Sequence, residues 1–313
     1  MRKLLLLIIV FVLLLIFWRY ETGEVDSNNK SQINIEVKSG EGVKEVAENL
    51  LSNHLIKNVY FFEIVARFAG LGSKLQAGNF SLSPSMNDNT IIANLEKNPA
   101  DLWITIPEGK RADEIAEILS HKMVNYNDNW KQLLEENEGY LFPDTYLLNK
   151  NASIQTVIAE FRNNFDTKYN SLTFNTNLTK EQVVILASLI EREGRSDSDR
   201  PLIASVFMNR LKLGMPLQVD STIQYALGYD SDSQTWWKSN LTADDLKIVS
   251  PYNTYINTGL PPGPICNPGV KALQAAASPA QSDYLFYVAD KNGVTHFAKT
   301  LNQQNENIKK YGI

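Results

Sequence analysis

The apolar positions that follow Thr179 recur at helical spacing and predict a helix ending at Gly194. Thr179 and Gln182 are placed as a capping box at its start, and Gly194 is placed as a left-handed stop. Residues at spacings of three and four share one face of such a helix. The stripe that results consists of Val183, Leu186, Ile190 and Glu193. A carboxyl group therefore ends an apolar stripe, and we expect the rest of the chain to be organised around this helix.

The position of Glu193 predicts an acid. Apolar neighbours disfavour a charged carboxylate, and the last turn of a helix carries partial negative charge, so both effects raise its pKa. A glutamate that stays protonated near neutral pH can act as a general acid. Glu191 lies about 160° round the helix, on the side of Val184, and is the runner-up. The alternative is that Glu193 only forms a surface ion pair with Arg192 or Arg195.

An unbroken apolar run at residues 4–18 follows Arg2 and Lys3 and predicts a transmembrane helix within residues 1–20. The residues after the run offer no small-residue cleavage site and no cysteine for a lipid, so we expect a retained anchor. The positive charge before the run predicts a cytoplasmic N-terminus and an external remainder. Trp18 and Tyr20 are expected at the membrane interface.

Beyond the anchor the pattern predicts an α+β chain in three parts. Residues 21–32 are polar and predict a tether. Residues 33–100 alternate between strand-like and helical spacing and predict a small α+β module. Residues 101–313 predict a larger α+β domain that contains the Glu193 helix, a hairpin about Asn292 and a C-terminal helix.

A short stretch of the chain occurs twice. Residues 40–50 match residues 109–119 at a glycine, two glutamates, an alanine and a leucine, and each copy follows a strand-like run. One interpretation is a pair of strand-turn-helix units of a common kind. The other is a duplicated polymer-binding unit, and the pattern leaves both open.

Two segments that follow the Glu193 helix in the sequence are expected to surround the candidate acid. Residues 215–220 are expected to be extended, with Gln218 and Asp220 on one face. Asp220 is either the second carboxylate of a glycosidase or a helix cap, and its spacing favours the cap. The long irregular segment at residues 250–267 is rich in proline and predicts an ordered wall.

Composition excludes several classes of protein. The formal net charge of -5, without a basic stripe, argues against binding to nucleic acid. The single cysteine, Cys266, cannot form an internal disulfide. Together with three scattered histidines it gives no metal-ligand spacing, so we expect no metal.

Several separate runs, in this order and spacing, resemble the endolytic murein transglycosylase family, also called YceG-like, over most of the chain after the anchor. They are EGYLFPDTY at 138–146, ASLIERE at 187–193, ASVFMNRL at 204–211, LQVDST at 217–222, YNTY at 252–255 and GLPPG at 259–263. No single run is decisive, but together they are specific.

The resemblance implies a single-pass protein of the bacterial inner membrane, with a LysM-like module at 33–100 and a periplasmic catalytic domain at 101–313. It implies that Glu193, the second glutamate of the Glu-x-Glu pair, is catalytic. Similar chains have Asp-Pro-Thr where this one has Asp220-Ser221-Thr222, a departure that we expect not to touch the acid. The candidates for holding the sugar are Gln218, Asp220, Tyr252, Asn253 and Tyr255.

The implied reaction is cleavage of the bond between N-acetylmuramic acid and N-acetylglucosamine within a peptidoglycan strand, which would stop strand growth. Glu193 would protonate the leaving oxygen and then deprotonate the muramoyl C6 hydroxyl, which forms a 1,6-anhydro end. Because this nucleophile belongs to the substrate, no second carboxylate is needed. No cofactor is implied, and membrane enzymes of wall synthesis are candidate partners.

Two other classes stay open. The first is a hydrolase on the same polymer, with Asp220 activating water. The second is a non-catalytic wall-binding or division scaffold, in which the glutamates are structural.

Overall fold

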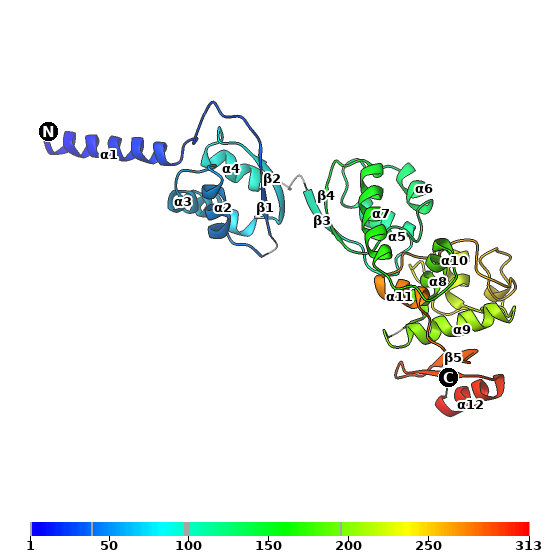
Figure 1. Cartoon of the computed structure of the whole chain (residues 1–313). Coiled ribbons are helices and arrows are strands. Elements are labelled where there is room, and N and C mark those ends of the chain that lie inside the picture. Colours follow the sequence, from blue (N-terminus) through cyan, green and yellow to red (C-terminus); the bar gives the residue numbers. More distant parts are fainter. Residues whose placement is uncertain (1, 39, 97–100, 195, 313) are drawn as a thin grey trace. The chain divides into compact units, whose positions relative to one another are not determined.

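A computed structural model of the chain describes residues 2–38, 40–96, 101–194 and 196–312. They form two compact units, which Figure 1 colours along the sequence. Unit 1 extends to Ile104 and also includes residues 146–151, and unit 2 contains residues 105–145 and those from 152 onward. The content is mixed helix and small antiparallel sheets, as predicted for an α+β chain. The boundary that we expected at residue 100 lies outside the described residues.

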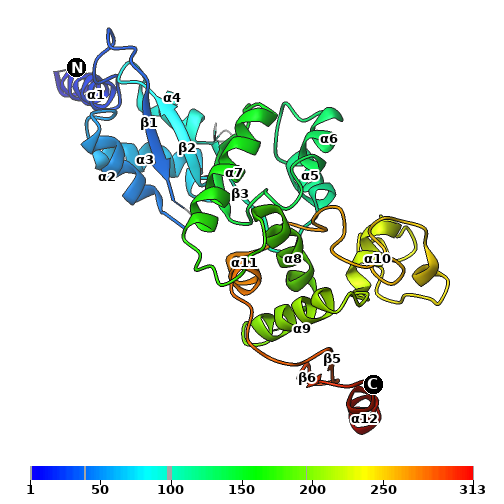
Figure 2. The ribbon, with the colours of Figure 1, turned by 45° about the vertical axis from the view of Figure 1, so that its right-hand side comes forward.

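A βααβ module with its own core makes up most of unit 1. Strand β1 (Ile33–Val37) pairs antiparallel with β2 (Gly78–Leu82), as Figure 2 shows. Between these strands the chain forms α2 (Val43–Ser52) and α3 (Val59–Ala69), which pack on each other. Buried side chains from both strands and both helices form one hydrophobic cluster. The unit also contains η1 (Leu71–Ser73) and α4 (Asp88–Leu95).

The N-terminal helix α1 (Arg2–Glu21) covers the apolar run. Among the described residues, however, no helix is both long enough and apolar enough to cross a membrane. The transmembrane anchor that we expected is therefore not supported by the structure. Trp18, which we expected at a membrane interface, makes an edge-to-face contact with Phe61 of α3, with ring centroids 5.5 Å apart.

Residues 21–32, which we predicted to be a tether, form hydrogen bonds to the module. The Thr22 carbonyl accepts a hydrogen bond from the Asp88 backbone N–H (3.1 Å), and the Ser83 hydroxyl donates to the Asn29 carbonyl (2.9 Å). A polar segment can be bound in this way through its backbone groups without burying apolar side chains.

A second strand pair connects the two units along the chain. Strand β3 (Asp101–Thr105) pairs with β4 (Thr145–Asn149), and the Thr105 and Thr145 hydroxyls lie 2.9 Å apart. Between these strands the chain forms α5 (Ala112–Ser120) and α6 (Asn129–Glu135), which pack on each other. The order strand, helix, helix, strand is the same as in the module.

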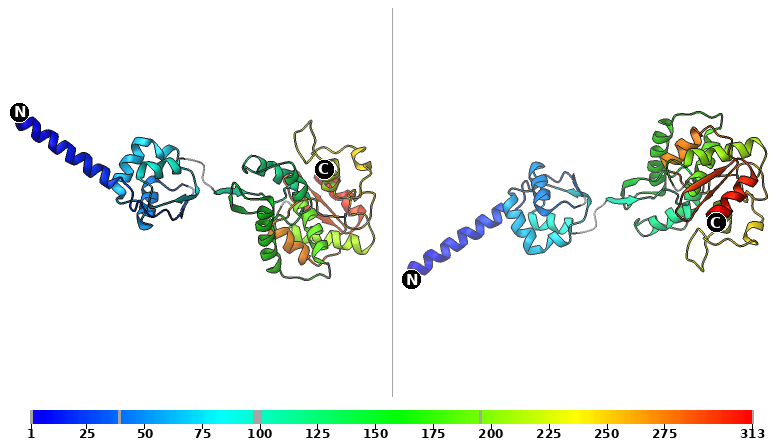
Figure 3. Two further views of the ribbon diagram at one scale, coloured as in Figure 1. Left: turned by 90° about the horizontal axis from the view of Figure 1, so that it is seen from above. Right: turned by 90° about the horizontal axis from the view of Figure 1, so that it is seen from below.

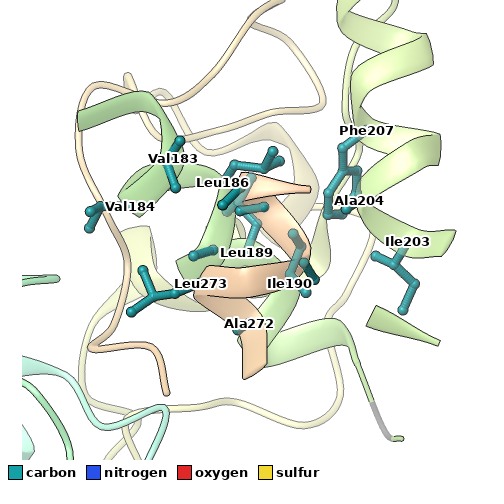
Figure 4. Close-up of a cluster of buried hydrophobic side chains, with 14 of the residues drawn as sticks. Val183, Val184, Leu186, Leu189, Ile190, Ile203, Ala204, Phe207, Ala272 and Leu273 are labelled. Atoms are coloured by element: carbon teal, nitrogen blue, oxygen red, sulfur yellow. The ribbon is translucent and has the colours of Figure 1, made fainter. Parts of the chain in front are cut away.

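The helix that carries Glu193, α8 (Lys180–Glu193), is the centre of the unit 2 core, as Figure 4 shows. It packs against α9 (Arg200–Lys212) and α11 (Val270–Ala277). Every side chain from Val183 to Ile190 is buried. The apolar surface therefore extends round the helix and is wider than the single stripe that spacing predicted.

The predicted start of α8 is confirmed, and its predicted end is wrong in one detail. Thr179 Oγ1 accepts from the Gln182 N–H (3.3 Å), and Gln182 Oε1 accepts from the Thr179 N–H (3.0 Å). Gly194 has φ -76° and ψ 105°, which is extended and not left-handed. A Cβ there would lie 2.6 Å from Arg200 Cγ. The close approach of Arg200, rather than a turn, accounts for the glycine.

The C-terminal part of unit 2 is the predicted hairpin with a helix beside it, as Figure 3 shows in orange and red. Strand β5 (Phe286–Ala289) pairs antiparallel with β6 (Thr295–Ala298), and α12 (Leu301–Tyr311) packs on both. The remaining elements of unit 2 are α7 (Ile154–Asn170), α10 (Asp220–Leu227) and η2 (Asp245–Lys247).

We expect Leu186→Ala to lower the free energy of unfolding by about 2–5 kcal/mol, because it removes buried volume from the centre of the α8 core. Leu213→Ala is the control, since Leu213 is 61% exposed, and should change it by about 0.5 kcal/mol or less. Urea unfolding followed by tryptophan fluorescence measures both. Equal effects of the two substitutions would show that α8 is not central to the core.

Candidate active site

The carboxyl group of Glu193 meets two hydroxyl groups at the end of α8. Tyr287, on β5, donates a hydrogen bond to Oε2 (3.0 Å). Ser221, in the first turn of α10, donates to Oε1 (3.1 Å). Glu193 is half-buried, so it is partly shielded from water and still reachable. Three elements that are distant in sequence thus converge on one carboxyl group.

Burial raises the pKa of Glu193 above its ordinary value. The hydrogen bonds from Tyr287 and Ser221 act in the opposite direction, because they stabilise the ionised form. Asp220 raises this pKa further and Arg192 lowers it, and the net change is upward. This upward shift of the pKa is the one that we expected from the sequence. The protonated acid therefore persists to a higher pH than in an exposed glutamate.

Glu191 occupies a structural position. Its Oε1 accepts from Arg200 Nη2 (3.0 Å) and its Oε2 accepts from the Gly269 backbone N–H (2.9 Å). Its side chain is only 6% exposed. Gly269 is the N-cap residue of α11, where unpaired N–H groups and the helix dipole favour a carboxylate. Both oxygens of Glu191 thus fasten α8 to its neighbours.

Arg192 points to an aromatic ring. Its guanidinium carbon lies 3.7 Å from the ring centroid of Trp237. Arg195, the other partner of a possible ion pair with Glu193, lies outside the described residues. The partners that the structure gives Glu193 are hydroxyl groups, which favours a chemical role over a surface ion pair.

Asp220 does not cap the helix that it begins. The N-cap residue of α10 is Val219, without a side-chain cap, and the Asp220 carboxylate instead accepts a hydrogen bond from the Tyr255 hydroxyl. The capping role that spacing favoured was wrong. The predicted alternation is confirmed, since Gln218 and Asp220 are exposed whereas Leu217 and Val219 are buried.

Thr254 joins the 250–267 segment to the residues around Asp220. The Gln218 N–H donates to the Thr254 carbonyl (3.0 Å), and the Val219 N–H donates to Thr254 Oγ1 (2.9 Å). Gln218 has a φ of 54°, a left-handed conformation that is uncommon outside glycine and is often found at functional sites. These bonds hold Gln218 and the wall in one arrangement.

The two tyrosines of the wall, Tyr252 and Tyr255, are both half-buried. Burial raises the pKa of Tyr255, and its bond to Asp220 raises it further, so its hydroxyl stays protonated. Tyr252 is half-buried, and its ring centroid lies 4.7 Å from that of Tyr225. A carboxylate with a hydroxyl donor and a pair of half-buried rings can bind the hydroxyl groups and faces of a sugar.

The structure places Asn253 inside the wall. It is fully buried, and its Nδ2 donates to the carbonyls of Leu246 (3.0 Å) and Ile248 (2.8 Å). Its Oδ1 accepts from the Tyr255 N–H (2.9 Å). Its amide is used within the loop, so its position favours shaping the wall over contacting a ligand.

Sequence reasoning missed both hydroxyl partners of the acid. Tyr287 lies far along the chain in a strand, and nothing local marks it. Ser221 was noted only as a departure from similar chains and was expected not to touch the acid. That expectation was wrong, because its hydroxyl donates directly to Glu193. For cofactors, the described part of the chain holds no group of three or more His, Cys, Asp or Glu side chains placed to bind a metal ion.

The chain matches the model of the YceG-like family over residues 35–310 and belongs to that family. It is 35% identical to the endolytic murein transglycosylase of Bacillus subtilis (strain 168), over 92% of this chain and 87% of the relative. It is 30% identical to the protein of the same name from Streptococcus pneumoniae strain D39, over 91% of this chain and 59% of the relative. The crystal structure of a YceG-like protein from Listeria monocytogenes superposes with a TM-score of 0.57 at 32% identity, over 88% of this chain and 99% of that one.

We expect Ser221→Ala to raise the pKa of Glu193, because it removes a donor that favours the ionised carboxylate. Titration of isotope-labelled glutamate carboxyl carbons by NMR measures this pKa, with the Glu193→Gln spectrum used to assign the signal. Ser120→Ala, in the last turn of α5, is the control and should leave the titration unchanged. An unchanged or lower pKa in Ser221→Ala would contradict the hydrogen bond.

Proposed function

We propose that this protein is an endolytic lytic transglycosylase of peptidoglycan, which cleaves the bond between N-acetylmuramic acid and N-acetylglucosamine inside glycan strands. The observation that carries the proposal is one half-buried glutamate, Glu193, which accepts hydrogen bonds from two hydroxyl donors and whose pKa is raised by burial. The names of the relatives supply the substrate class.

The proposed chemistry uses one carboxyl group twice. In the first step, neutral Glu193 gives its proton to the glycosidic oxygen, and the bond from that oxygen to the anomeric carbon breaks. In the second step, the Glu193 carboxylate takes the proton of the muramoyl C6 hydroxyl, whose oxygen forms the new bond to the anomeric carbon. The product has a 1,6-anhydro end, no water is consumed, and Glu193 is protonated again.

The hydroxyl groups of Tyr287 and Ser221 support both halves of this cycle. They stabilise the carboxylate that exists between the two proton transfers, while burial raises the pKa of the resting acid and so favours its protonated form. A general acid works best when its pKa lies near the working pH. The net effect of burial and of the two hydrogen bonds is to raise the pKa of Glu193, which brings it closer to neutral pH. Gln218, Asp220, Tyr252 and Tyr255 are proposed to hold the sugar next to the acid.

Hydrolysis is the second candidate, and one observation favours it. Asp220 lies close enough to Glu193 to raise its pKa, and its carboxylate is exposed. Such a group could activate water from the opposite side of the sugar. Its bond from Tyr255 argues for positioning instead, and the product end distinguishes the two reactions, because hydrolysis leaves a reducing end.

The location is part of the same proposal. Large apolar side chains are exposed along much of α1, among them Phe11, Leu13 and Phe17. Such a surface favours burial in lipid. We propose attachment to the bacterial cell membrane through residues 1–20, with a cytoplasmic N-terminus and unit 2 outside, beside growing strands and the membrane enzymes that make them. Cell fractionation of the full chain and of a chain lacking residues 1–20 tests this, and recovery of both in the same fraction would contradict it.

We expect Glu193→Gln to abolish the formation of anhydro ends, with a loss of about 10²–10⁴-fold in rate, because the proton donor is gone. Mass spectrometry of the fragments released from peptidoglycan by the full chain in detergent measures the ends. Glu191→Gln should keep the product type, with lower stability, because Glu191 fastens α8 to Arg200 and Gly269. Glu181→Gln, at an exposed position in the first turn of α8, is the control and should leave both the rate and the product unchanged.

Three outcomes would contradict parts of this account. Reducing ends from the wild-type protein would indicate a hydrolase and make Asp220 the residue to substitute next. Loss of activity in Glu191→Gln but not in Glu193→Gln would exchange their roles. The absence of cleavage on both nascent and mature strands would favour a wall-binding scaffold.

A further inference from the structure

The short repeat in the sequence is also a repeat in structure. Gly40 and Gly109, which match in the two stretches, both have positive φ, at 84° and 73°. The residues three positions further on, Val43 and Ala112, each begin a helix, α2 and α5. In each case a strand precedes the turn, a second helix follows, and a strand paired with the first one closes the unit.

The matching helices also bury matching positions. Ala47 and Leu50 of α2 are fully buried, and so are their counterparts Ala116 and Leu119 of α5, each 2% exposed or less. The match in sequence therefore corresponds to the same packed face and is more than a shared surface pattern. It supports a duplication of the βααβ module.

We propose that residues 101–149 are a second copy of the βααβ module and that its two loops hold residues 264–269 of the same chain as an internal ligand. In this arrangement Asn267 and Glu138 are positioning residues for the active site. The positioning role of these two residues rests on the proposed function, whereas the duplication and the internal ligand do not.

Asn267 is bound from both loops of the second copy. In the loop before α5, the Gly109 N–H donates to the Asn267 carbonyl (3.0 Å), and the Lys110 carbonyl accepts from the Asn267 N–H (2.9 Å). In the loop after α6, the Leu141 N–H donates to Asn267 Oδ1 (2.8 Å). Asn267 is fully buried, so release of the segment would break three hydrogen bonds that are shielded from water.

Glu138 connects the same three parts. Its two carboxylate oxygens lie 3.1 and 2.9 Å from the N–H of Ala112, the first residue of α5, and Oε1 also accepts from Asn267 Nδ2 (2.7 Å). Glu138 is 8% exposed, and burial raises its pKa to about 8. A buried carboxyl group with these donors is costly to disturb, because removing any one partner leaves the others desolvated.

At the corresponding glycine of the first copy, the described residues leave open space. In the second copy, a Cβ on Gly139 would lie 2.4 Å from Pro264 Cγ, so the segment packs directly on this glycine, whose φ is 85°. In the first copy, Gly70 occupies the corresponding helix-to-strand connection with a φ of 74°, and a Cβ there would meet nothing within 4 Å. Beside it lies a cavity of about 410 Å³, lined among others by Val43 and Gly72.

The held segment is joined to two parts of the acid site. On one side it continues the wall that carries Tyr252 and Tyr255. On the other side it ends at Gly269, whose N–H donates a hydrogen bond to Glu191. Glu191 lies in the last turn of α8, two residues before Glu193. A shift of this segment would therefore displace both the wall and the end of α8.

The test compares Gly139→Ala with Gly70→Ala. Both substitutions place a Cβ on a left-handed glycine and carry a similar backbone penalty, about 1–2 kcal/mol. Only Gly139→Ala also pushes against neighbours, which are Pro264 of the held segment and Val184 of α8, whose Cγ1 would lie 2.8 Å from the new Cβ. Asn267→Ala disturbs the same segment without adding a side chain beside Val184. Cys266 reports the outcome directly, because it is the only cysteine of the chain, lies within the held segment and is fully buried. The rate at which a thiol reagent labels Cys266 under native conditions measures how often the segment opens.

We expect Gly139→Ala to increase the labelling rate by about tenfold or more over Gly70→Ala, since a tenfold change in an opening equilibrium needs only about 1.4 kcal/mol. We also expect a lower kcat per folded molecule in Gly139→Ala, with folding checked by near-ultraviolet circular dichroism. Asn267→Ala should also label faster at Cys266 and have a lower kcat per folded molecule. This variant replaces Gly139→Ala in the test if Gly139→Ala does not fold.

Three results separate the parts of the proposal. Equal labelling rates in Gly139→Ala and Gly70→Ala would overturn the internal ligand. Faster labelling with an unchanged kcat per folded molecule would overturn the positioning role. If the wild-type chain releases no anhydro ends, the proposed function fails, and the labelling comparison still decides whether the second copy holds the segment.

Discussion

The proposed chemistry of unit 2 depends on the balance of forces at the Glu193 carboxyl group. Burial of α8 on all sides brings this group to the edge of an apolar core, where an unpaired carboxylate is costly. The hydroxyl groups of Tyr287 and Ser221 reduce that cost without adding charge. A positively charged partner would have lowered the pKa and removed the acid. With hydroxyl donors, both oxygens of the Glu193 carboxyl group have hydrogen-bond partners, and the group can still carry and release a proton.

The neighbouring glutamate shows the opposite solution on the same helix. Glu191 is paired with Arg200 and with the N-terminus of α11, and it holds α8 in place. Glu191 is thus bound by a cation and a backbone N–H. Glu193 is bound only by neutral hydroxyl donors in its hydrogen bonds. Together with Thr254 and Asn267, which fasten the wall, these contacts place the proposed acid and the candidate sugar contacts on connected, well-packed elements.

Local features were predictable from the sequence, and long-range ones were not. The capping box of Thr179, the alternation around Gln218 and the hairpin about Asn292 depend on residues close in sequence, and the structure has them. Tyr287 lies on a strand far from α8, so no spacing could assign it to Glu193. The glycine at position 194 was correctly placed at the helix end, but its physical reason, the approach of Arg200, is a tertiary contact. The repeat was visible in the sequence, and only the strand pairing and the glycine conformations show its structural meaning.

The central claim is that Glu193 transfers protons while the nucleophile belongs to the substrate. Cleavage of peptidoglycan in water enriched with heavy oxygen tests it directly, because mass spectrometry of the new ends shows whether solvent oxygen has entered. The account predicts new muramoyl ends without the heavy isotope and lighter than reducing ends by one water. Heavy oxygen in each new end would contradict it and show that water is the nucleophile.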